Sequence, residues 1–126
     1  MVESNLRGIE NETLATFREH RPSEYFSHLE DDEEYRKHHQ RVEELYRFGL
    51  MLPPEIFMNK SVIDLGAGTG EHTISLALWG AECHLVELNA EAVDVARRVF
   101  ERGLPGEDFR RQTFSCQSLF DVDTSQ

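Results

Sequence analysis

The residues best suited to chemistry stand in one short stretch, Ser61 to His72, which reads SVIDLGAGTGEH. A short apolar run leads to Asp64, and glycines follow at positions 66, 68 and 70. Glycine lacks a Cβ atom, so it lets a ligand approach the backbone closely. A carboxylate beside such a turn can orient an ammonium group through charge-assisted hydrogen bonds. The pattern therefore predicts a ligand-binding turn.

Two kinds of phosphate site fit this turn poorly. A Walker loop needs the pattern G-x-x-x-x-G-K-[ST], whereas this turn is shorter and has no lysine. The dinucleotide pattern G-x-G-x-x-G fits Gly66 and Gly68, but Glu71 stands where the third glycine belongs. A pyrophosphate would meet the charge of that glutamate. A cofactor with a nucleoside and a charged amino-acid tail fits better. A nucleotide-binding relative, or a turn that only packs a helix on a strand, stays as an alternative.

The elements around the turn follow from the period of the apolar residues. A short β-branched run at 62–65 predicts a buried strand, and the segments 71–79 and 90–102 predict helices. Asn89 is the expected N-cap of the second helix. Two further strands are expected at 81–88 and from Phe109 to about Cys116. Right-handed crossovers then give a parallel sheet with helices packed on it.

This order predicts an α/β fold, the first three strands of a Rossmann-like doubly wound parallel sheet. Such sheets bind ligands at the carboxyl ends of their strands. Residues 1–58 are expected to form an N-terminal helical segment, and residues 59–126 the first half of the α/β domain. Within the first segment, 31–52 reads as a helix that ends before Pro53. Its expected apolar face consists of Tyr35, Val42, Leu45, Tyr46 and Leu50.

Composition excludes some classes of function. The chain has 126 residues and a formal net charge of −11, so it offers no basic stripe for nucleic acid, and an anionic membrane surface fits equally poorly. No run approaches the ~20 apolar residues of a membrane helix, and the N-terminus lacks a secretory pattern. A cytoplasmic protein is expected. Cys83 and Cys116 are expected to be free thiols on neighbouring strands, and no metal site is expected.

The stretch VIDLGAGTG resembles motif I of the class I S-adenosylmethionine-dependent methyltransferases, in which an acid and a hydrophobic residue precede G-x-G-x-G. Glu87, at the end of the second expected strand, matches the family's next acid. The resemblance implies S-adenosyl-L-methionine as the cofactor, with ribose hydroxyls on the Glu87 carboxylate and the adenine on Leu88. A carboxylate suits two vicinal hydroxyls on chemical grounds as well.

A third match lies after the third expected strand. The family usually has an acid there, near the adenine amino group, whereas this chain has Gln117 followed by Ser118. Glutamine accepts a hydrogen bond through its carbonyl but without charge. The residues that the resemblance places around the cofactor are Asp64, Gly66, Ala67, Gly68, Gly70, Glu87, Leu88, Gln117 and Ser118.

The resemblance implies a methyltransferase in the full-length form, acting on a small molecule. The family's sheet has seven strands with the first in the middle, so we expect either an N-terminal part of a longer protein or a sheet completed by another chain. A dimer or partner would pair with the exposed edge of the first strand. A non-catalytic interaction module is the alternative.

The catalytic base stays unassigned at this point. It is expected in the remaining half of the fold or among the N-terminal helices. His38 and His39 are expected to face solvent, and His72 to lie on a helix surface. The candidates in the N-terminal segment are Tyr25, Phe26, Tyr35, His38, His39 and Tyr46.

Overall fold

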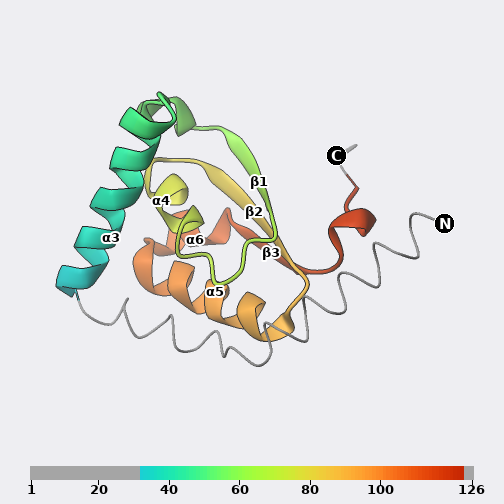
Figure 1. Ribbon diagram of the computed structural model, residues 1–126. Coiled ribbons are helices and arrows are strands. Elements are labelled where there is room, and N and C mark those ends of the chain that lie inside the picture. Colours follow the sequence, from blue (N-terminus) through green and yellow to red (C-terminus); the bar gives the residue numbers. More distant parts are fainter. Residues whose placement is uncertain (1–31, 124–126) are drawn as a thin grey trace.

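The computed structural model describes residues 32–123 and shows a mixed α/β fold with a three-stranded parallel sheet. The expected alternation of strand and helix is confirmed (Figure 1). Expectations for residues 1–31, including Tyr25 and Phe26, lie outside the described residues. The helices and strands are α3 (Asp32–Glu44), β1 (Ser61–Leu65), α4 (Thr73–Leu78), β2 (Glu82–Glu87), α5 (Ala90–Gly103), α6 (Gly106–Arg110) and β3 (Thr113–Cys116).

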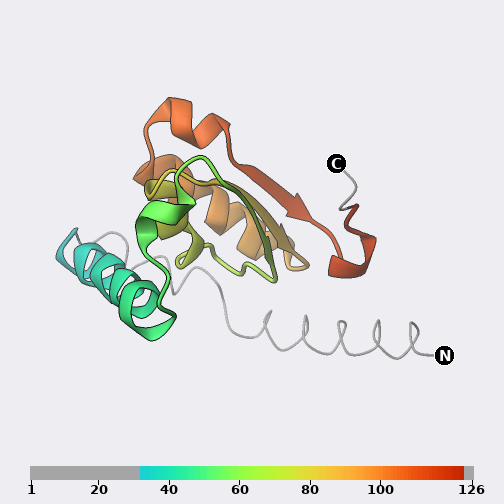
Figure 2. The ribbon, with the colours of Figure 1, turned by 90° about the horizontal axis from the view of Figure 1, so that it is seen from above.

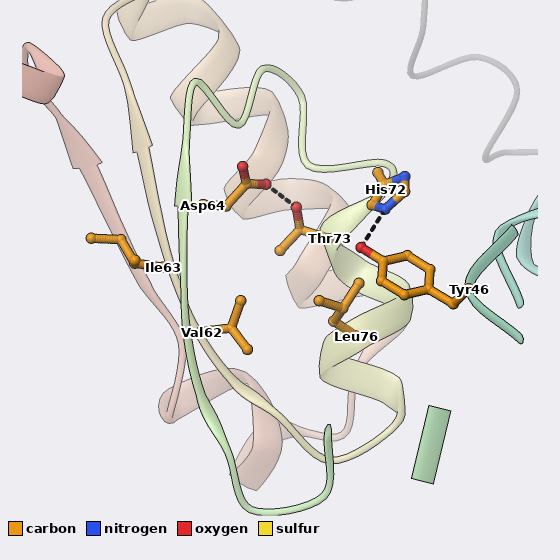
Figure 3. A pocket seen from close by; sticks show the side chains of 7 residues that line it. All are labelled: Tyr46, Val62, Ile63, Asp64, His72, Thr73 and Leu76. Carbon is orange, nitrogen blue, oxygen red and sulfur yellow. Dashed lines mark hydrogen bonds between the residues drawn. The ribbon is translucent and has the colours of Figure 1, made fainter. Parts of the chain in front are cut away.

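The sheet has the order β1-β2-β3, and both pairs of neighbours are parallel. Within the described residues β1 pairs only with β2, so it is an edge of the sheet, as predicted. The side chains of β1 alternate between the two faces. Val62 and Asp64 point toward α4, whereas Ile63 points away from it and is 47% exposed (Figure 3).

Helix α5 forms because its apolar residues recur on one face. Asn89 caps it as predicted, since its side chain accepts a hydrogen bond of 3.1 Å from the Glu91 amide. The face turned to the sheet ends in Phe100, which is fully buried and meets Phe114 of β3 edge to face, with ring centroids 5.2 Å apart. The core thus lies between the sheet and the helix pair α4 and α5.

The third strand is shorter than predicted. It begins at Thr113, because the preceding residues form the short helix α6, which starts after Pro105. Glu107 and Asp108 occupy the first turn of α6, where acids favour a helix. Gln112 then leads into β3 with a buried side chain, whose Oε1 accepts a 2.6 Å hydrogen bond from the Cys83 amide.

The helix expected at 31–52 ends earlier than predicted. After α3 the chain makes one π-helical turn, Leu45–Gly49. A π-turn holds more residues than an α-turn, so it rotates the apolar face away from the core. Val42 is buried, but Leu45 and Leu50 are 46% and 51% exposed, which corrects their predicted place on the inner face.

Tyr46 keeps its inward direction in this turn. Its ring packs edge to face on Phe57 and on Trp79, with centroids 5.5 and 5.4 Å away. This aromatic cluster fastens the segment before β1 to the C-terminal end of α4. Figures 1 and 2 show α3 at one end of the described part and the C-terminal residues Leu119–Asp121 at the other.

The two thiols are free, as predicted. Cys83 is fully buried, whereas Cys116 at the end of β3 is exposed. Burial, with a smaller effect of the Asp64 charge, raises the pKa of Cys83 to about 12. Among the helices of residues 32–123, none has the length and apolar character needed to cross a membrane.

Candidate functional site

The glycine turn follows β1 at the carboxyl edge of the sheet. Gly66, Gly68 and Gly70 all have positive φ angles, of 78°, 59° and 72°. The amides of Gly66 and Ala67 donate to the carbonyl oxygen of Val86 at 2.8 and 3.1 Å, which ties the turn to the end of β2. The turn therefore has a fixed backbone shape with positive φ angles, which residues with a Cβ atom adopt only with strain.

The three glycines have different surroundings. A Cβ atom built on Gly66 or Gly68 would meet no atom within 4 Å, so these two positions border open space. A Cβ atom on Gly70 would lie 3.0 Å from Phe100 and 3.2 Å from both Ala96 and Leu85. The first two glycines thus offer bare backbone to a ligand, whereas the third lets the turn approach α5.

Glu87 joins the turn to the start of α5. One carboxylate oxygen, Oε1, accepts from the Gly68 amide at 2.9 Å, and Oε2 accepts from the Asn89 amide at 2.8 Å. The side chain is half-buried. Each carboxylate oxygen can accept more than one hydrogen bond. The carboxylate therefore holds the turn in place and keeps acceptor capacity for hydroxyl groups.

The residues at the ends of β2 and β3 are joined through the backbone carbonyl oxygens of Glu87 and Leu88. The Gln117 amide donates to the carbonyl oxygen of Glu87 at 3.2 Å, and the carbonyl of Leu88 accepts from the Cys116 thiol at 3.5 Å. Gln117 and Leu88 are both half-buried. Ser118 is buried, and its hydroxyl accepts from the Phe120 amide at 3.1 Å. Glu87, Leu88 and Gln117 thus gather at one edge, while Ser118 caps the turn that follows.

Asp64 faces a hollow of about 260 Å³ between β1 and α4. Its Oδ2 accepts a hydrogen bond from the hydroxyl of Thr73, the first residue of α4 (Figure 3). Because Asp64 points to the helix side of β1, it lines the hollow below the turn. The residues around the hollow are Tyr46, Val62, Ile63, Asp64, His72, Thr73 and Leu76.

Two of these residues form a pair that sequence reasoning did not predict. His72 Nε2 and the Tyr46 hydroxyl lie 2.8 Å apart at the mouth of the hollow (Figure 3). Burial lowers the pKa of His72; Asp64 opposes this shift and His38 adds to it. Burial also raises the pKa of Tyr46, with help from Asp64 and Cys83. At neutral pH the pair is therefore an uncharged imidazole and a protonated phenol beside one carboxylate.

Two histidines attach α3 to the chain around α4, which corrects their predicted exposure to solvent. His38 Nε2 donates to the carbonyl oxygen of Glu71 at 2.7 Å. His39 Nδ1 lies 2.6 Å from the hydroxyl of Ser75. Both side chains are half-buried. They cover α4 instead of facing solvent, because the helix turns their side toward α4.

We expect His39 to make stability depend on pH. Burial, reinforced by the nearby His38, lowers the pKa of His39 below 6.5 in the folded protein. The unfolded chain then binds more protons than the folded one as pH falls below 6.5. The contribution of the neutral imidazole is complete above that pH and is lost as pH falls through the folded pKa. Urea unfolding at pH 7.5 and 5.5 measures the loss.

The variant His39→Asn removes this titration and keeps a short polar side chain beside Ser75. Its loss of unfolding free energy between the two pH values is expected to be smaller than that of the wild type. Equal losses in the two proteins would contradict the contribution of His39.

The chemistry that this edge supports is recognition of hydroxyl and cationic groups. The Gly68 amide, which a phosphate would use, already donates to Glu87, and that carboxylate places a negative charge in the turn. In residues 32–123 no three side chains of His, Cys, Asp or Glu gather as a metal site would require. The turn and Glu87 were predictable from the sequence, whereas Thr73, His72 and Tyr46 carried no recognisable motif.

Comparison of the chain with protein-family models, with curated proteins and with solved structures gives no match.

Proposed function

We propose that this chain carries the cofactor-binding site of an S-adenosylmethionine-dependent methyltransferase with a Rossmann-like sheet. The observation that supports it is that a glycine turn meets the Glu87 carboxylate at the carboxyl ends of two adjacent parallel strands. Gly66 and Gly68 border open space, and Glu87 holds the Gly68 amide at 2.9 Å. Parallel α/β sheets place their ligands at this edge.

The charges at the edge favour this cofactor over a dinucleotide. S-adenosylmethionine carries a sulfonium and an ammonium group but no phosphate. The carboxyl edge of the sheet presents the carboxylates of Asp64 and Glu87, which suit these cations. Glu87 offers acceptor capacity to the vicinal hydroxyls of a ribose, and Leu88 beside it offers an apolar surface to a base. A pyrophosphate would be repelled by Glu87 and would find the Gly68 amide already occupied.

The residues of the chain would bind the cofactor and align its methyl group for transfer. Gly66 and Gly68 let the cofactor lie against the backbone, and Glu87 fixes its ribose. Gln117 offers an uncharged amide to the adenine amino group, and Asp64 offers a carboxylate to the ammonium group. The bound cofactor supplies an activated methyl group, so alignment and proximity account for most of the rate. A small-molecule acceptor fits an acidic chain better than a nucleic acid does.

Titration calorimetry with S-adenosylmethionine tests the proposal. The wild-type chain is expected to bind, and Glu87→Gln is expected to bind about 10- to 100-fold more weakly, because hydrogen bonds to a charged acceptor contribute ~1.5–3 kcal/mol each. Glu82→Gln is the matched control. Glu82 is exposed at the opposite end of the same strand, so this variant is expected to bind as the wild type does.

Three results would contradict the proposal. The wild-type chain would release no heat with S-adenosylmethionine, or Glu87→Gln would bind as tightly as Glu82→Gln. The third is binding of NAD⁺ or ATP in preference to S-adenosylmethionine, which would favour the nucleotide-binding alternative. Circular dichroism of each variant confirms that the fold is retained.

A further inference from the structure

The hollow beside Asp64 has a lining that the proposed cofactor contacts hardly use. It lies between β1 and α4, below the glycine turn, and measures about 260 Å³ (Figure 3). Asp64 belongs to both sets of residues, whereas Gly66, Gly68 and Glu87 do not line the hollow. An engineered apolar cavity of about 150 Å³ already holds a benzene molecule. The hollow is therefore large enough for a small one-ring ligand of its own.

Asp64 supplies the charge of the hollow. Among the described lining residues there is no lysine, no arginine and no second acid. Burial lowers the pKa of His72 at the mouth, so its imidazole is uncharged at neutral pH. Asp64 itself is half-buried and takes part in no ion pair within residues 32–123. A carboxylate withdrawn from water is stabilised by an opposite charge, which a cationic ligand would supply here.

Thr73 fixes the direction of this carboxylate. Its side chain is only 2% exposed, and its hydroxyl donates to Oδ2 of Asp64 (Figure 3). The other oxygen, Oδ1, accepts no hydrogen bond from any residue in the range 32–123. An ammonium group carries three donors, so it can give one of them to Oδ1. Such a bond joins two charged groups and belongs to the strong class.

The walls of the hollow suit an apolar body. Leu76 of α4 is 5% exposed and Val62 of β1 is half-buried, and both side chains point into the space between strand and helix (Figure 3). The Tyr46 ring borders the mouth, and aromatic rings attract ammonium groups to their faces. This ring packs edge to face on Phe57, and its hydroxyl lies 2.8 Å from His72 Nε2. Because internal contacts already hold these walls, a ligand has fewer side chains to order.

We propose that the hollow binds a small primary amine with an apolar body. The ammonium group donates to Oδ1 of Asp64, and the hydrocarbon part lies between Val62 and Leu76. The carboxylate repels anionic ligands, and a neutral apolar ligand would leave it without a counter-charge. The net charge of −11 acts in the same direction, because it attracts cations to the chain.

The amine site is defined by the lining of the hollow and does not depend on the proposed function. Oδ1 is the one oxygen of Asp64 that Thr73 leaves available. Asp64 therefore holds either the amine or the ammonium group of a cofactor, and not both at once.

Titration of benzylamine, followed by the amide signals of the protein in NMR, tests the site. The wild-type chain is expected to bind benzylamine at neutral pH with a Kd of about 1 mM, a usual affinity for a ligand of this size. The amide signals of Asp64, Thr73 and Leu76 are expected to shift. Benzyl alcohol has the same ring but no charge, so it is expected to bind at least tenfold more weakly.

Asp64→Asn removes the charge, keeps the size of the side chain and can still accept from Thr73. It is expected to bind benzylamine at least tenfold more weakly than the wild type, because the acceptor is no longer charged. Asp94→Asn is the matched control. Asp94 is exposed on α5 and does not line the hollow, so this variant is expected to bind as the wild type does. Circular dichroism checks that both variants are folded.

Four results would overturn the amine site. The wild-type spectrum would not change up to about 10 mM benzylamine, or benzyl alcohol would bind as tightly as benzylamine. The third is equal affinity of Asp64→Asn and Asp94→Asn for benzylamine. The fourth is a set of shifts confined to residues outside the hollow. The titrations contain no S-adenosylmethionine, so their failure is separate from a failure of the proposed function.

Discussion

Replacing Gly70 by alanine is expected to lower the free energy of unfolding by about 2–5 kcal/mol. The new Cβ atom would lie 3.0 Å from Phe100 and 3.2 Å from Ala96, closer than such atoms normally approach. Overpacking of this kind costs ~1–3 kcal/mol. The φ angle of 72° adds roughly 1–2 kcal/mol of left-handed strain for a residue with a Cβ atom. Urea denaturation followed by circular dichroism measures the sum.

Gly66→Ala separates the two causes. Gly66 has nearly the same φ angle, 78°, but an added Cβ atom meets nothing within 4 Å. This variant is expected to lose only the strain term, about 1–2 kcal/mol. Equal losses at the two positions would show that packing against α5 contributes nothing, and the close approach at Gly70 would then be incidental.

Replacing Phe100 by alanine is expected to lower the free energy of unfolding by about 3–5 kcal/mol, the usual cost of removing a buried aromatic side chain. Phe100 is fully buried, packs edge to face on Phe114, and lies directly against Gly70. The cavity would open between α5, the sheet and the glycine turn. Total stabilities of domains are about 5–15 kcal/mol, so this change removes a large share.

Leu119→Ala is the control for this prediction, because Leu119 is 46% exposed. Substitutions at such positions usually change stability by no more than about 0.5 kcal/mol. Thermal and urea unfolding of both variants give the comparison. A loss below about 1 kcal/mol for Phe100→Ala would contradict the central place of this ring in the core.

The sheet and α5 were predictable because their signals are local. The β-branched run before Asp64 and the apolar face of α5 each match a single period, and the Asn89 side chain caps the helix as its type suggests. The start of β3 was predicted wrongly. Phe109 looks like a strand residue by type, but Pro105 and the acids after it begin a helix there.

The candidate site was predictable only in part. The glycines and Glu87 follow one another along two strand ends, so their proximity comes directly from the order of elements. Tyr46 reaches the hollow beside Asp64 from a segment before the sheet, and its place depends on a π-helical turn. A π-turn leaves no simple period in the sequence. For the same reason the exposed positions of Leu45 and Leu50 were not predictable.

The parallel register has a consequence for how the protein folds. Ser61 pairs with Glu82 and His84 with Thr113, so the partners are 21 (61 to 82) and 29 (84 to 113) positions apart. No ladder of the described sheet can therefore start as a hairpin, and the entropy of each loop closure is lost before pairing compensates for it. Helices α4 and α5 lie inside these loops and shorten them as they form. The glycine turn thus takes its final shape only when helices and sheet have assembled together. A ligand that recognises the turn binds the folded chain and not the unfolded one, so it stabilises the entire α/β unit.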